Sequence, residues 1–535
     1  MAVRLSCHRY PGHHFLGHLR RGKREGEVRV TGRRLPQHGW RISWLFVTCL
    51  VLGQAIGTAA ADQQTGSFGT GTRWETPWTV IEADAPGPTV LIVGGLHGNE
   101  PAGAQAAEQM RDWPVVRGKL VVLPAVNRLG LAANLRWFPE FQDDPRQRDL
   151  NRNFPTRQRA DALTPLCQQI WAFLQDHPPT WVFDLQEGFD VHRVNSKSVG
   201  SSVIAFPAEA EFAAALVGAV NAATPPRQHF SLLAKSGPVA GSLARACAEQ
   251  LGAKSFILET TFKDQPLSLR SRQHRQMVSH ALLEIGLIES ACVDRVAPAA
   301  AAHVTRVALF DDRGANEGPV SRLLKKHPQF VVRHVGGPEM RADVLEQFDV
   351  LLFPGGSGSR QGKAIGSGGR QHVREFVREG GGVLGICAGA FLCTSHYPWS
   401  LHLMNAAVFN VTVDVPGVGR RSMWYRGPAT DVEIDITSPG AEILGLAGRQ
   451  TVRYENGPIL SPGEDATLPM FTPLAFFRSE NGIYPAQKKT MVDTPAVVTA
   501  QFGRGRVLAI SPHFESTPGA GAVVLRGIDY LRSQP

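Results

Sequence analysis

Residues 93–103 read VGGLHGNEPAG and place His97 three positions before Glu100, directly after a run of apolar residues. An imidazole and a carboxylate at this spacing can bind one Zn²⁺ and leave a position open for water. In α/β proteins the chemistry gathers where parallel strands end, and the position after an apolar run fits that rule. The pair alone is a weak signal, so its significance depends on the rest of the chain.

Two further segments carry groups that a metal-assisted hydrolase needs. RDLNRNFP at 148–155 contains Asn151 and Arg152, whose amide and guanidinium donors can hold a carboxylate. ILETTF at 257–262 places Glu259 at the end of an apolar run. A carboxylate there can take a proton from metal-bound water and return it to a leaving amine.

A second constellation lies near the C-terminus. GGGVLGICAGAFL at 380–392 predicts a sharp turn at Cys387, between an apolar strand and a helix start that favours the thiolate. SPHFE at 511–515 offers His513 as the base and Glu515 as the group that orients its imidazole. Gly355 and Gly356 in LLFPGGSGS are candidates for an oxyanion hole made of backbone N–H groups. The alternative is that Cys387 is a buried small residue in a tight turn.

HGNEPAG, DLNRNFP and the strand with Glu259, in this order over residues 88–290, resemble the zinc carboxypeptidase superfamily, and more closely its succinylglutamate desuccinylase/aspartoacylase branch. The resemblance implies one zinc ion and hydrolysis of an amide bond next to a carboxylate. It makes His97 and Glu100 metal ligands and Glu259 the catalytic base. Asn151 and Arg152 would hold the substrate carboxylate.

The third metal ligand is the point where the sequence departs from that family. Its members usually carry a histidine in a strand-end DLH, and the matching triplet here ends in Gln186. An amide oxygen is a neutral and weaker zinc ligand than imidazole. His192, six residues on, is an alternative donor. Arg136 in NLRW is a further candidate for substrate contact, with Arg128 as its competitor.

FPGG, GICAGA, NGP at 456–458 and SPHFE, spread over residues 304–533, resemble the class I glutamine amidotransferase fold. The nearest resemblance is to the N-terminal domain found on some biotin-protein ligases. It implies a triad of Cys387, His513 and Glu515. Glutaminase-type hydrolysis, another thiol-dependent hydrolysis and ligand binding all remain open.

The strands and helices that carry these residues form two unlike α/β series, each a mostly parallel or mixed sheet flanked by helices. We expect a zinc carboxypeptidase-like domain over 76–290, an Ala/Pro linker with little to pack over 291–303, and a flavodoxin-like domain of the amidotransferase type over 304–535. Apolar runs such as TWVFDLQ and FDVLLFPGG predict buried strands, and residues 162–176 and 207–222 predict helices. Residues 62–75 show no periodicity and are expected to be mobile.

Charge and composition restrict the remaining possibilities. Ten of the Lys and Arg residues and only two Glu fall within residues 1–61, so most of the net charge of +9 lies there. The nearly neutral remainder excludes a nucleic-acid footprint. The basic leader, an apolar run and Ala59 to Ala61 predict a signal peptide cleaved before Asp62, with an uncleaved anchor as the alternative. Five cysteines would remain, an odd number without a disulfide framework.

The sequence thus predicts an exported zinc amidohydrolase joined to an amidotransferase-like domain, without a stable membrane span after cleavage. The substrates would be small acylated amino acids or short peptides. One alternative is a binding or sensor protein that retains both pockets, and another is a protein in which only the thiol domain is active. The oligomeric state is not predicted.

Overall fold

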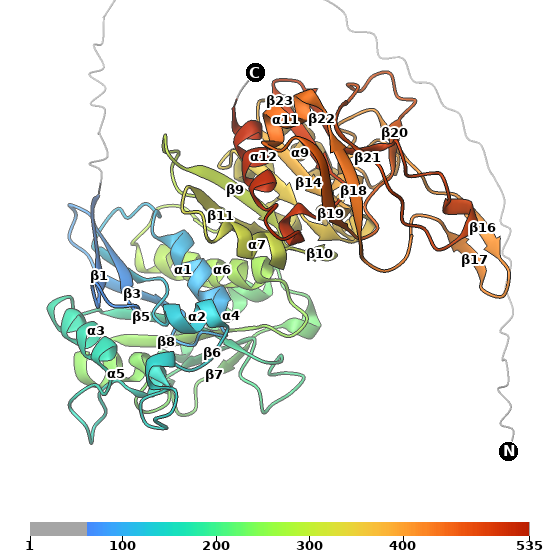
Figure 1. The fold of residues 1–535 in the computed structure, drawn as a ribbon. Helices are drawn as coiled ribbons and strands as arrows, with labels where there is room; N and C mark the ends of the chain where they lie inside the picture. The colour runs from blue at the N-terminus through green and yellow to red at the C-terminus, as the bar shows by residue number, and fades with distance from the viewer. Residues whose placement is uncertain (1–60, 534–535) are drawn as a thin grey trace, which may run out of the picture. The chain divides into compact units, whose positions relative to one another are not determined.

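The computed structural model describes residues 61–533. The basic leader and apolar run of the expected signal peptide lie outside these residues. Residues 61–533 group as one compact unit, in which most strands belong to two large sheets (Figure 1). The predicted fold class, α/β with two domains of mixed sheets and flanking helices, is confirmed. Over residues 61–533, none of the helices has the length and apolar character that crossing a membrane requires.

The first sheet has eight strands in the order β1-β2-β4-β3-β5-β8-β6-β7. Its central strands β4, β3, β5 and β8 are parallel, whereas β2 and β6 pair with them in the antiparallel sense. The strands are β1 Asp62–Phe68, β2 Thr76–Glu82, β3 Thr89–Gly94, β4 Lys119–Leu123, β5 Trp181–Gly188, β6 Ser202–Ala205, β7 Ser231–Leu233 and β8 Lys254–Thr261.

Helices cover both faces of this sheet, which explains why its central strands are continuous apolar runs. Val90 and Ile92 point to one face and Leu91 and Val93 to the other, and all four are fully buried. The first face packs against α1 Pro101–Met110, α4 Ala210–Asn221 and α6 Leu267–Ile285, and the second against α3 Pro165–Asp176 and α5 Leu243–Leu251. The short α2 Arg128–Ala133 follows β4.

The second large sheet has nine strands in the order β11-β9-β12-β14-β23-β22-β21-β18-β19. The five strands from β11 to β23 are parallel, and the rest are antiparallel. The strands are β9 Thr305–Phe310, β11 Phe330–Val335, β12 Val350–Phe353, β14 Gly382–Ile386, β18 Thr430–Ile436, β19 Gly448–Tyr454, β21 Thr472–Phe477, β22 Pro495–Phe502 and β23 Gly505–Ile510.

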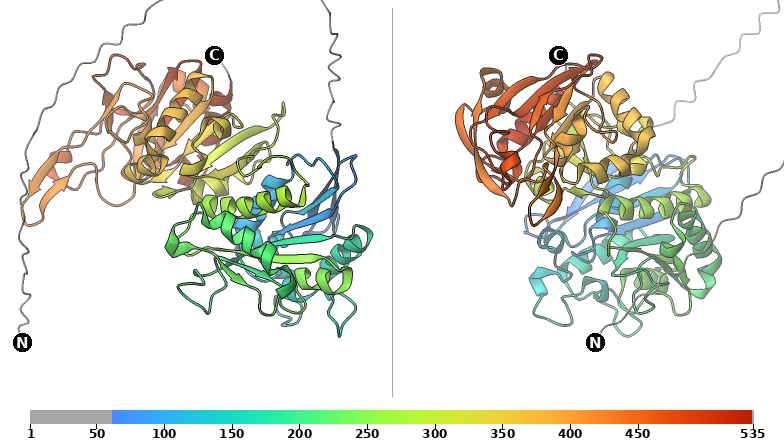
Figure 2. Two further views of the ribbon diagram at one scale, coloured as in Figure 1. Left: turned by 180° about the vertical axis from the view of Figure 1, so that it is seen from behind. Right: turned by 90° about the vertical axis from the view of Figure 1, so that its right-hand side faces the viewer.

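This sheet is also covered on both faces. One core joins it to α8 Ala342–Leu345, α9 Gly358–Arg378 and α10 Ala388–Cys393, and the other to α7 Gly318–Leu324, α11 Ser438–Leu444 and α12 Ala522–Arg532 (Figure 2). Three two-stranded sheets are formed by β10 Ala315–Asn316 with β13 Gly355–Gly356, β15 Ala406–Val408 with β20 Leu460–Pro462, and β16 Thr412–Val415 with β17 Gly419–Ser422.

Short 3₁₀ helices complete the connections. They are η1 Pro139–Phe141, η2 Leu150–Arg152, η3 Pro207–Glu209, η4 Pro226–Gln228, η5 Gly337–Glu339, η6 Pro485–Gln487 and η7 Phe514–Ser516. The β16–β17 hairpin projects from the second domain in Figures 1 and 2.

Two sequence expectations are wrong. The segment expected to be mobile contains β1, which pairs with β2 along its whole length, because the ladder needs only backbone groups and not an apolar pattern. The segment expected to have little to pack contains Cys292 and Val296, which are fully or almost fully buried. Val296 joins the core of the second domain, so the first part of the linker is packed, whereas residues 299–303 are exposed as expected.

Candidate active sites

Adjacent parallel strands bring the first candidate site together. The loop between β3 and α1 carries His97 and Glu100, β5 carries Asp184 and Gln186, and β8 carries Glu259. In the β5–β8 ladder Gln186 lies directly opposite Glu259. Helix α1 packs closely on β5, because a Cβ on Gly103 would lie 2.2 Å from the carbonyl oxygen of Leu185. This close contact holds the loop against the ends of the neighbouring strands.

His97 is 4% exposed and lies between two carboxylates. Its Nε2 is 3.0 Å from Oδ1 of Asp149, and its Nδ1 is 2.9 Å from Oε1 of Glu100. Nδ1 has no hydrogen-bond partner by geometry, although it lies at ion-pair distance from Glu100. Burial lowers the pKa of His97, but Glu100 and Asp149 outweigh burial and raise it to about 9. A positive charge between Nδ1 of His97 and Oε1 of Glu100 is therefore favourable.

Glu100 is almost completely buried and is held by three groups. Besides His97, Nη1 of Arg136 donates to its Oε1 at 2.8 Å, and the backbone N–H of Glu187 donates to its Oε2 at 3.0 Å. Arg136, predicted to contact substrate, is thus an ion-pair partner of Glu100. Its side chain is 36% exposed and also lines the neighbouring cavity.

Gln186 is oriented by a buried carboxylate. Its Nε2 donates to Oδ1 of Asp184 at 2.6 Å, and Nδ2 of Asn151 donates to Oδ2 of the same carboxylate at 3.1 Å. Burial raises the pKa of Asp184 to about 6, against the lowering effect of these two amides. Because Asp184 takes the amide nitrogen, the oxygen of Gln186 is the end that remains for another partner.

Asn151 and Arg152, which were predicted to hold the substrate carboxylate, differ in whether protein groups already occupy their side chains. Asn151 uses its nitrogen on Asp184, and its oxygen accepts the backbone N–H of Leu243 at the start of α5. Arg152 is exposed, and its Nη1 donates to the carbonyl oxygen of Asn151 at 2.7 Å. Asn151 therefore joins β5 to α5, whereas the guanidinium of Arg152 faces solvent.

Glu259 is 7% exposed, and its Oε2 has no hydrogen-bond partner. Burial, followed by the nearby carboxylates Glu100 and Asp184, raises the pKa of Glu259 well above its usual value. A buried carboxyl group with a free oxygen at the end of a central strand is a typical proton-transfer group.

His192, the alternative metal ligand to Gln186, and Arg128, the competitor of Arg136 for substrate contact, lie outside this site. Nδ1 of His192 is 2.7 Å from the carbonyl oxygen of Ser198, and Nη1 of Arg128 donates to the carbonyl oxygen of Glu75 at 2.6 Å. Neither residue has a hydrogen bond or ion pair with His97 or Glu100 among residues 61–533.

A cavity of 420 Å³ adjoins this site and contains two cationic side chains, Arg136 and Lys197, together with Asn99 and Phe189. Sequence reasoning missed Lys197 and Asp149. Asp149 lies inside RDLNRNFP, so its position in the motif was available as a signal. Lys197 lies in the long loop between β5 and β6, where no pattern distinguishes it.

The second candidate site surrounds Cys387, between β14 and α10. Cys387 has φ 50° and ψ −100°, a conformation that side-chain-bearing residues rarely adopt, and its N–H donates to the carbonyl oxygen of Ile510 at 2.8 Å. The turn is packed so closely that a Cβ on Gly389 would lie 2.0 Å from the carbonyl oxygen of Phe353. The thiol is 3.4 Å from the carbonyl oxygen of Glu455.

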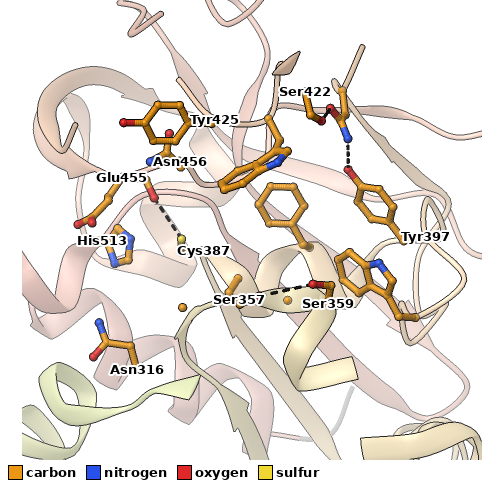
Figure 3. Close-up of a pocket in the computed structure, with 17 residues that line it drawn as sticks. Asn316, Ser357, Ser359, Cys387, Tyr397, Ser422, Tyr425, Glu455, Asn456 and His513 are labelled. Carbon is orange, nitrogen blue, oxygen red and sulfur yellow. Dashed lines mark hydrogen bonds between the residues drawn. The ribbon is translucent and has the colours of Figure 1, made fainter. Parts of the chain in front are cut away.

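His513 lies beside this thiol (Figure 3). Nδ1 of His513 is 2.6 Å from Oε1 of Glu515, and Nε2 is buried without a hydrogen-bond partner. Burial lowers the pKa of His513, but Cys387 and Glu515 raise it to about 10. A Cβ on Gly355 would lie 3.1 Å from Cε1 of His513 and 3.9 Å from Cβ of Cys387, so this backbone adjoins both side chains. Gly356, with φ 118°, lines the same cavity.

The protonated His513 is expected to make stability depend on pH. Its pKa in the folded chain, about 10, exceeds the ordinary value of 6.5, so the stabilisation is complete below pH 6.5 and is lost as the pH rises toward 10. We therefore expect the urea midpoint to fall between pH 7 and pH 10, and to fall less in His513→Gln. An equal fall in both proteins would contradict this assignment.

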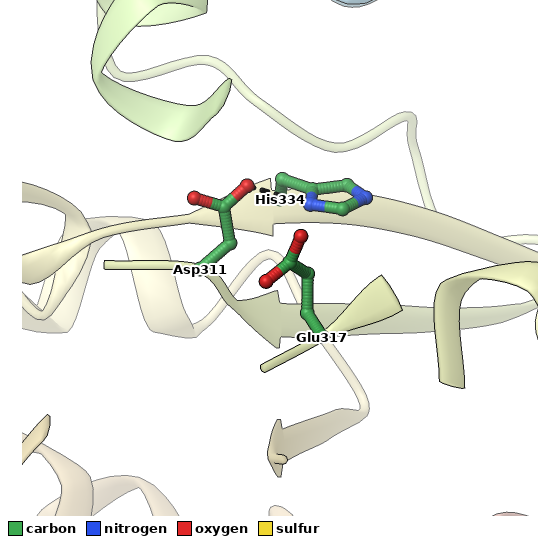
Figure 4. A group of neighbouring side chains, drawn as sticks. All are labelled: Asp311, Glu317 and His334. Atoms are coloured by element: carbon green, nitrogen blue, oxygen red, sulfur yellow. Dashed lines mark hydrogen bonds and ion pairs between the residues drawn. The ribbon is translucent and has the colours of Figure 1, made fainter. Parts of the chain in front are cut away.

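A third group of side chains, Asp311, Glu317 and His334, is close enough to share a metal ion (Figure 4). These atoms are already in use, however. Nδ1 of His334 is 2.8 Å from Oδ2 of Asp311, Nε2 is 3.3 Å from Oγ of Ser321, and Oδ1 of Asp311 accepts from Oγ of Ser268 at 3.1 Å. Asp311 and His334 are therefore explained by their hydrogen bonds to each other and to two serines.

The geometry thus defines a two-domain α/β protein with a His/carboxylate site in the first domain and a Cys/His/Glu site in the second. Residues 86–281 match the family model of the succinylglutamate desuccinylase/aspartoacylase catalytic domain, and residues 317–414 match that of the biotin-protein ligase N-terminal domain. Both predicted resemblances are confirmed. The first match supports a hydrolase of amide bonds as the class of this protein.

Individual relatives match more weakly. Pyridoxal 5'-phosphate synthase subunit PdxT of Halorubrum lacusprofundi is 27% identical over 135 residues, 22% of this chain and 68% of that protein. Among solved structures, the cell shape determinant protein Csd4 of Helicobacter pylori is 22% identical over 38% of this chain, with a TM-score of 0.33. The succinylglutamate desuccinylase/aspartoacylase of Rhodobacter sphaeroides is 23% identical over 43% of this chain and 67% of its own, with a TM-score of 0.31. The chain spans about half of Csd4, 52% of its length.

Proposed function

We propose that the first domain is a zinc-dependent amidohydrolase that cleaves an amide bond next to a carboxylate in small acylated amino acids or short peptides. The observation that carries this proposal is the arrangement of His97 and Glu100. Their facing atoms, Nδ1 and Oε1, are 2.9 Å apart without a hydrogen bond, and Asp149 occupies the other nitrogen of the imidazole.

The residues present fit a zinc ion. An ionised Asp149 can only accept, so Nε2 of His97 is the donor and Nδ1 is the nitrogen left to ligate. Zinc ligands lie about 2.0–2.2 Å from the metal, which puts two ligand atoms of a tetrahedral site about 3.3–3.6 Å apart. The observed 2.9 Å is shorter, so the two side chains would separate slightly to admit the ion. The amide oxygen of Gln186, opposite Glu259 in the ladder, is the available third donor.

When bound, zinc would polarise the scissile carbonyl and acidify a water molecule. Glu259 would receive the proton of that water and pass it to the leaving amine. Arg136, Arg152 and Lys197 supply the positive charge that holds a substrate carboxylate, from the rim of the cavity or beside it. Asp149 orients the imidazole of His97. The division into two domains belongs to the same proposal, with the first domain extended from residue 76 back to Asp62 because β1 is part of its sheet. Export through a cleaved signal is proposed as well.

Substitution of Gln186 by histidine tests the metal site. An imidazole at this position is a stronger zinc donor, so we expect zinc affinity to rise at least about tenfold, or about 1.4 kcal/mol, in a chelator competition titration. Gln158→His, at an exposed position of the same domain, is the matched control. No gain in Gln186→His would show that the side chain does not face the metal. If neither the unmodified protein nor Gln186→His binds zinc, the proposal of a zinc site fails.

The substrate class is tested with pairs of compounds that differ only in one carboxylate. N-acetyl and N-succinyl amino acids and short peptides should be hydrolysed, whereas the same compounds with the neighbouring carboxylate converted to an amide should react poorly. Equal rates for the carboxylate and the amide compounds would show that Arg136, Arg152 and Lys197 do not hold the substrate carboxylate. Zinc binding without hydrolysis of any compound would favour the alternative, a binding protein that retains the pocket.

A second activity is proposed for the other domain, on the evidence of the Cys387 geometry. The strained turn presents the thiol to the free Nε2 of His513, whose other nitrogen is held by Glu515. Cys387 would be the nucleophile and His513 its base, and the backbone at Gly355 and Gly356 would face the developing oxyanion. Alkylation by chloroacetamide at neutral pH, at a rate above that of an ordinary thiol, is the test.

A further inference from the structure

The cavity above Cys387 has one catalytic end and one aromatic end. Its volume is 520 Å³, within the range that holds a drug-sized ligand. Cys387 and His513 lie at the first end in Figure 3. Five aromatic side chains also line the cavity: Phe391, Tyr397, Trp399, Trp424 and Tyr425.

The aromatic end contains a rigid flat surface. The rings of Tyr397 and Trp399 are stacked, with centroids 4.5 Å apart and planes 9° apart. Nδ2 of Asn410 donates to the hydroxyl of Tyr397 at 3.1 Å, which fixes the ring of Tyr397. A flat, fixed pair of rings favours another flat ring in offset or edge contact.

Two further aromatic side chains of the lining, Trp424 and Tyr425, are only partly covered by the protein. Trp424 and Tyr425 follow the β16–β17 hairpin and are 47% and 41% exposed. They meet edge to face, with ring centroids 5.9 Å apart. Exposed aromatic surface that lines a cavity indicates a place where an apolar group of a ligand is buried.

The lining of the cavity offers an anionic ligand little unpaired positive charge. Its lining residues include no Lys or Arg among the described part of the chain. The carboxylate of Glu455 is neutralised by Arg453, 2.9 Å away on the outside of the site. A free amino acid such as glutamine would bring a carboxylate, and the protonated His513 of the lining is already paired with Glu515.

From these observations we propose that the Cys387 site hydrolyses a neutral carboxamide that carries a flat aromatic ring within a few bonds of its carbonyl group. This proposal rests on the thiol activity proposed above and names its substrate class. Sγ of Cys387 bonds to the carbonyl carbon, the carbon–nitrogen bond breaks, and His513 passes the thiol proton to the leaving amine. Water then cleaves the thioester, which releases the acid and restores the thiol.

Three alkylating reagents test this proposal on the full chain. They are 2-chloro-N-methylacetamide, 2-chloro-N-(naphthalen-1-ylmethyl)acetamide and N-(chloroacetyl)glycine, and each labelling rate is divided by the rate of that reagent with glutathione. In each case a sulfur–carbon bond forms at Cys387 and chloride leaves, while His513 retains the proton of the thiol. We expect the naphthyl reagent to label Cys387 at least about tenfold faster than the methyl reagent, and the glycine reagent to be slower than the methyl reagent.

Substitutions at the aromatic end identify the residues responsible. Trp424→Ala and Trp399→Ala should bring the naphthyl-to-methyl ratio close to one, and Trp424→Phe should keep most of it. Met470→Ala, a change at a residue that is 58% exposed and outside the cavity, should leave the ratio as it is. Protection of the wild-type chain from the methyl reagent by unreactive 1-naphthaleneacetamide, but not by glutamine, gives the same information without a variant.

The outcomes separate the two proposals. If Cys387 reacts fast with all reagents and the ratio is close to one, the substrate class is wrong and the nucleophile stands. If the glycine reagent is fastest, the ligand is an anion and the substrate class is again wrong. If no reagent reacts faster than it does with an ordinary thiol, the thiol activity itself fails.

Discussion

Glu259→Gln is expected to slow amide hydrolysis by the first domain about 10²–10⁴-fold, the usual contribution of a general acid–base group. The amide has nearly the same shape as the carboxyl group but cannot take up a proton. The buried Oε2 of Glu259 has no partner to lose, so the fold should tolerate the change. The measurement is the rate of hydrolysis of an N-acyl amino acid at saturating substrate.

The control for this variant is Glu289→Gln, at an exposed position of the same domain. It should retain the wild-type rate. Zinc content and thermal midpoint of Glu259→Gln should stay close to those of the unmodified protein. An undiminished rate would remove Glu259 from the mechanism, and a lost metal would show that it acts as a ligand instead.

Glu339→Ala is expected to destabilise the fold by about 3–5 kcal/mol, the usual cost of leaving a buried charge without its partner. Oε1 of Glu339 accepts from Arg275 at 2.8 Å and from Arg272 at 3.1 Å, and the Arg275 side chain is completely buried. Burial lowers the pKa of Arg275 to about 10, although Glu339 opposes this effect. The free energy of unfolding, from urea titrations followed by fluorescence, is the measurement.

Asp343→Ala provides the comparison, because Asp343 pairs with Arg341 on the surface, where both side chains are at least 40% exposed. Exposed ion pairs contribute at most about 1 kcal/mol. A loss in Glu339→Ala no larger than the loss in Asp343→Ala would mean that solvent reaches Arg275 and compensates its charge.

The sequence explains why the residues of the first site lie near one another, because each residue follows or ends a strand. The strands are continuous apolar runs, and parallel strands end at one edge of the sheet, so His97, Gln186 and Glu259 had to be neighbours. The partners of these residues were not predictable in the same way. The amide of Asn151 could equally hold a substrate or a protein group, and only the packing of α5 decides that it bonds to Leu243.

The aromatic end of the second cavity lay beyond sequence reasoning for a different reason. Trp399 lies after α10, whereas Trp424 and Tyr425 follow a hairpin that projects from the domain, and no periodicity connects these positions. Their meeting above Cys387 depends on the path of long connections between β14 and β18. Nothing local in the sequence specifies that path.

The left-handed backbone at Cys387 has a consequence for heat-resistant variants of this protein. A side chain held in such a conformation costs roughly 1–3 kcal/mol, which glycine would largely avoid. Libraries screened for survival at high temperature alone should therefore accumulate Cys387→Gly, and the most durable clones would be those without a nucleophile. Tolerance to heat and thiol chemistry compete at this one position.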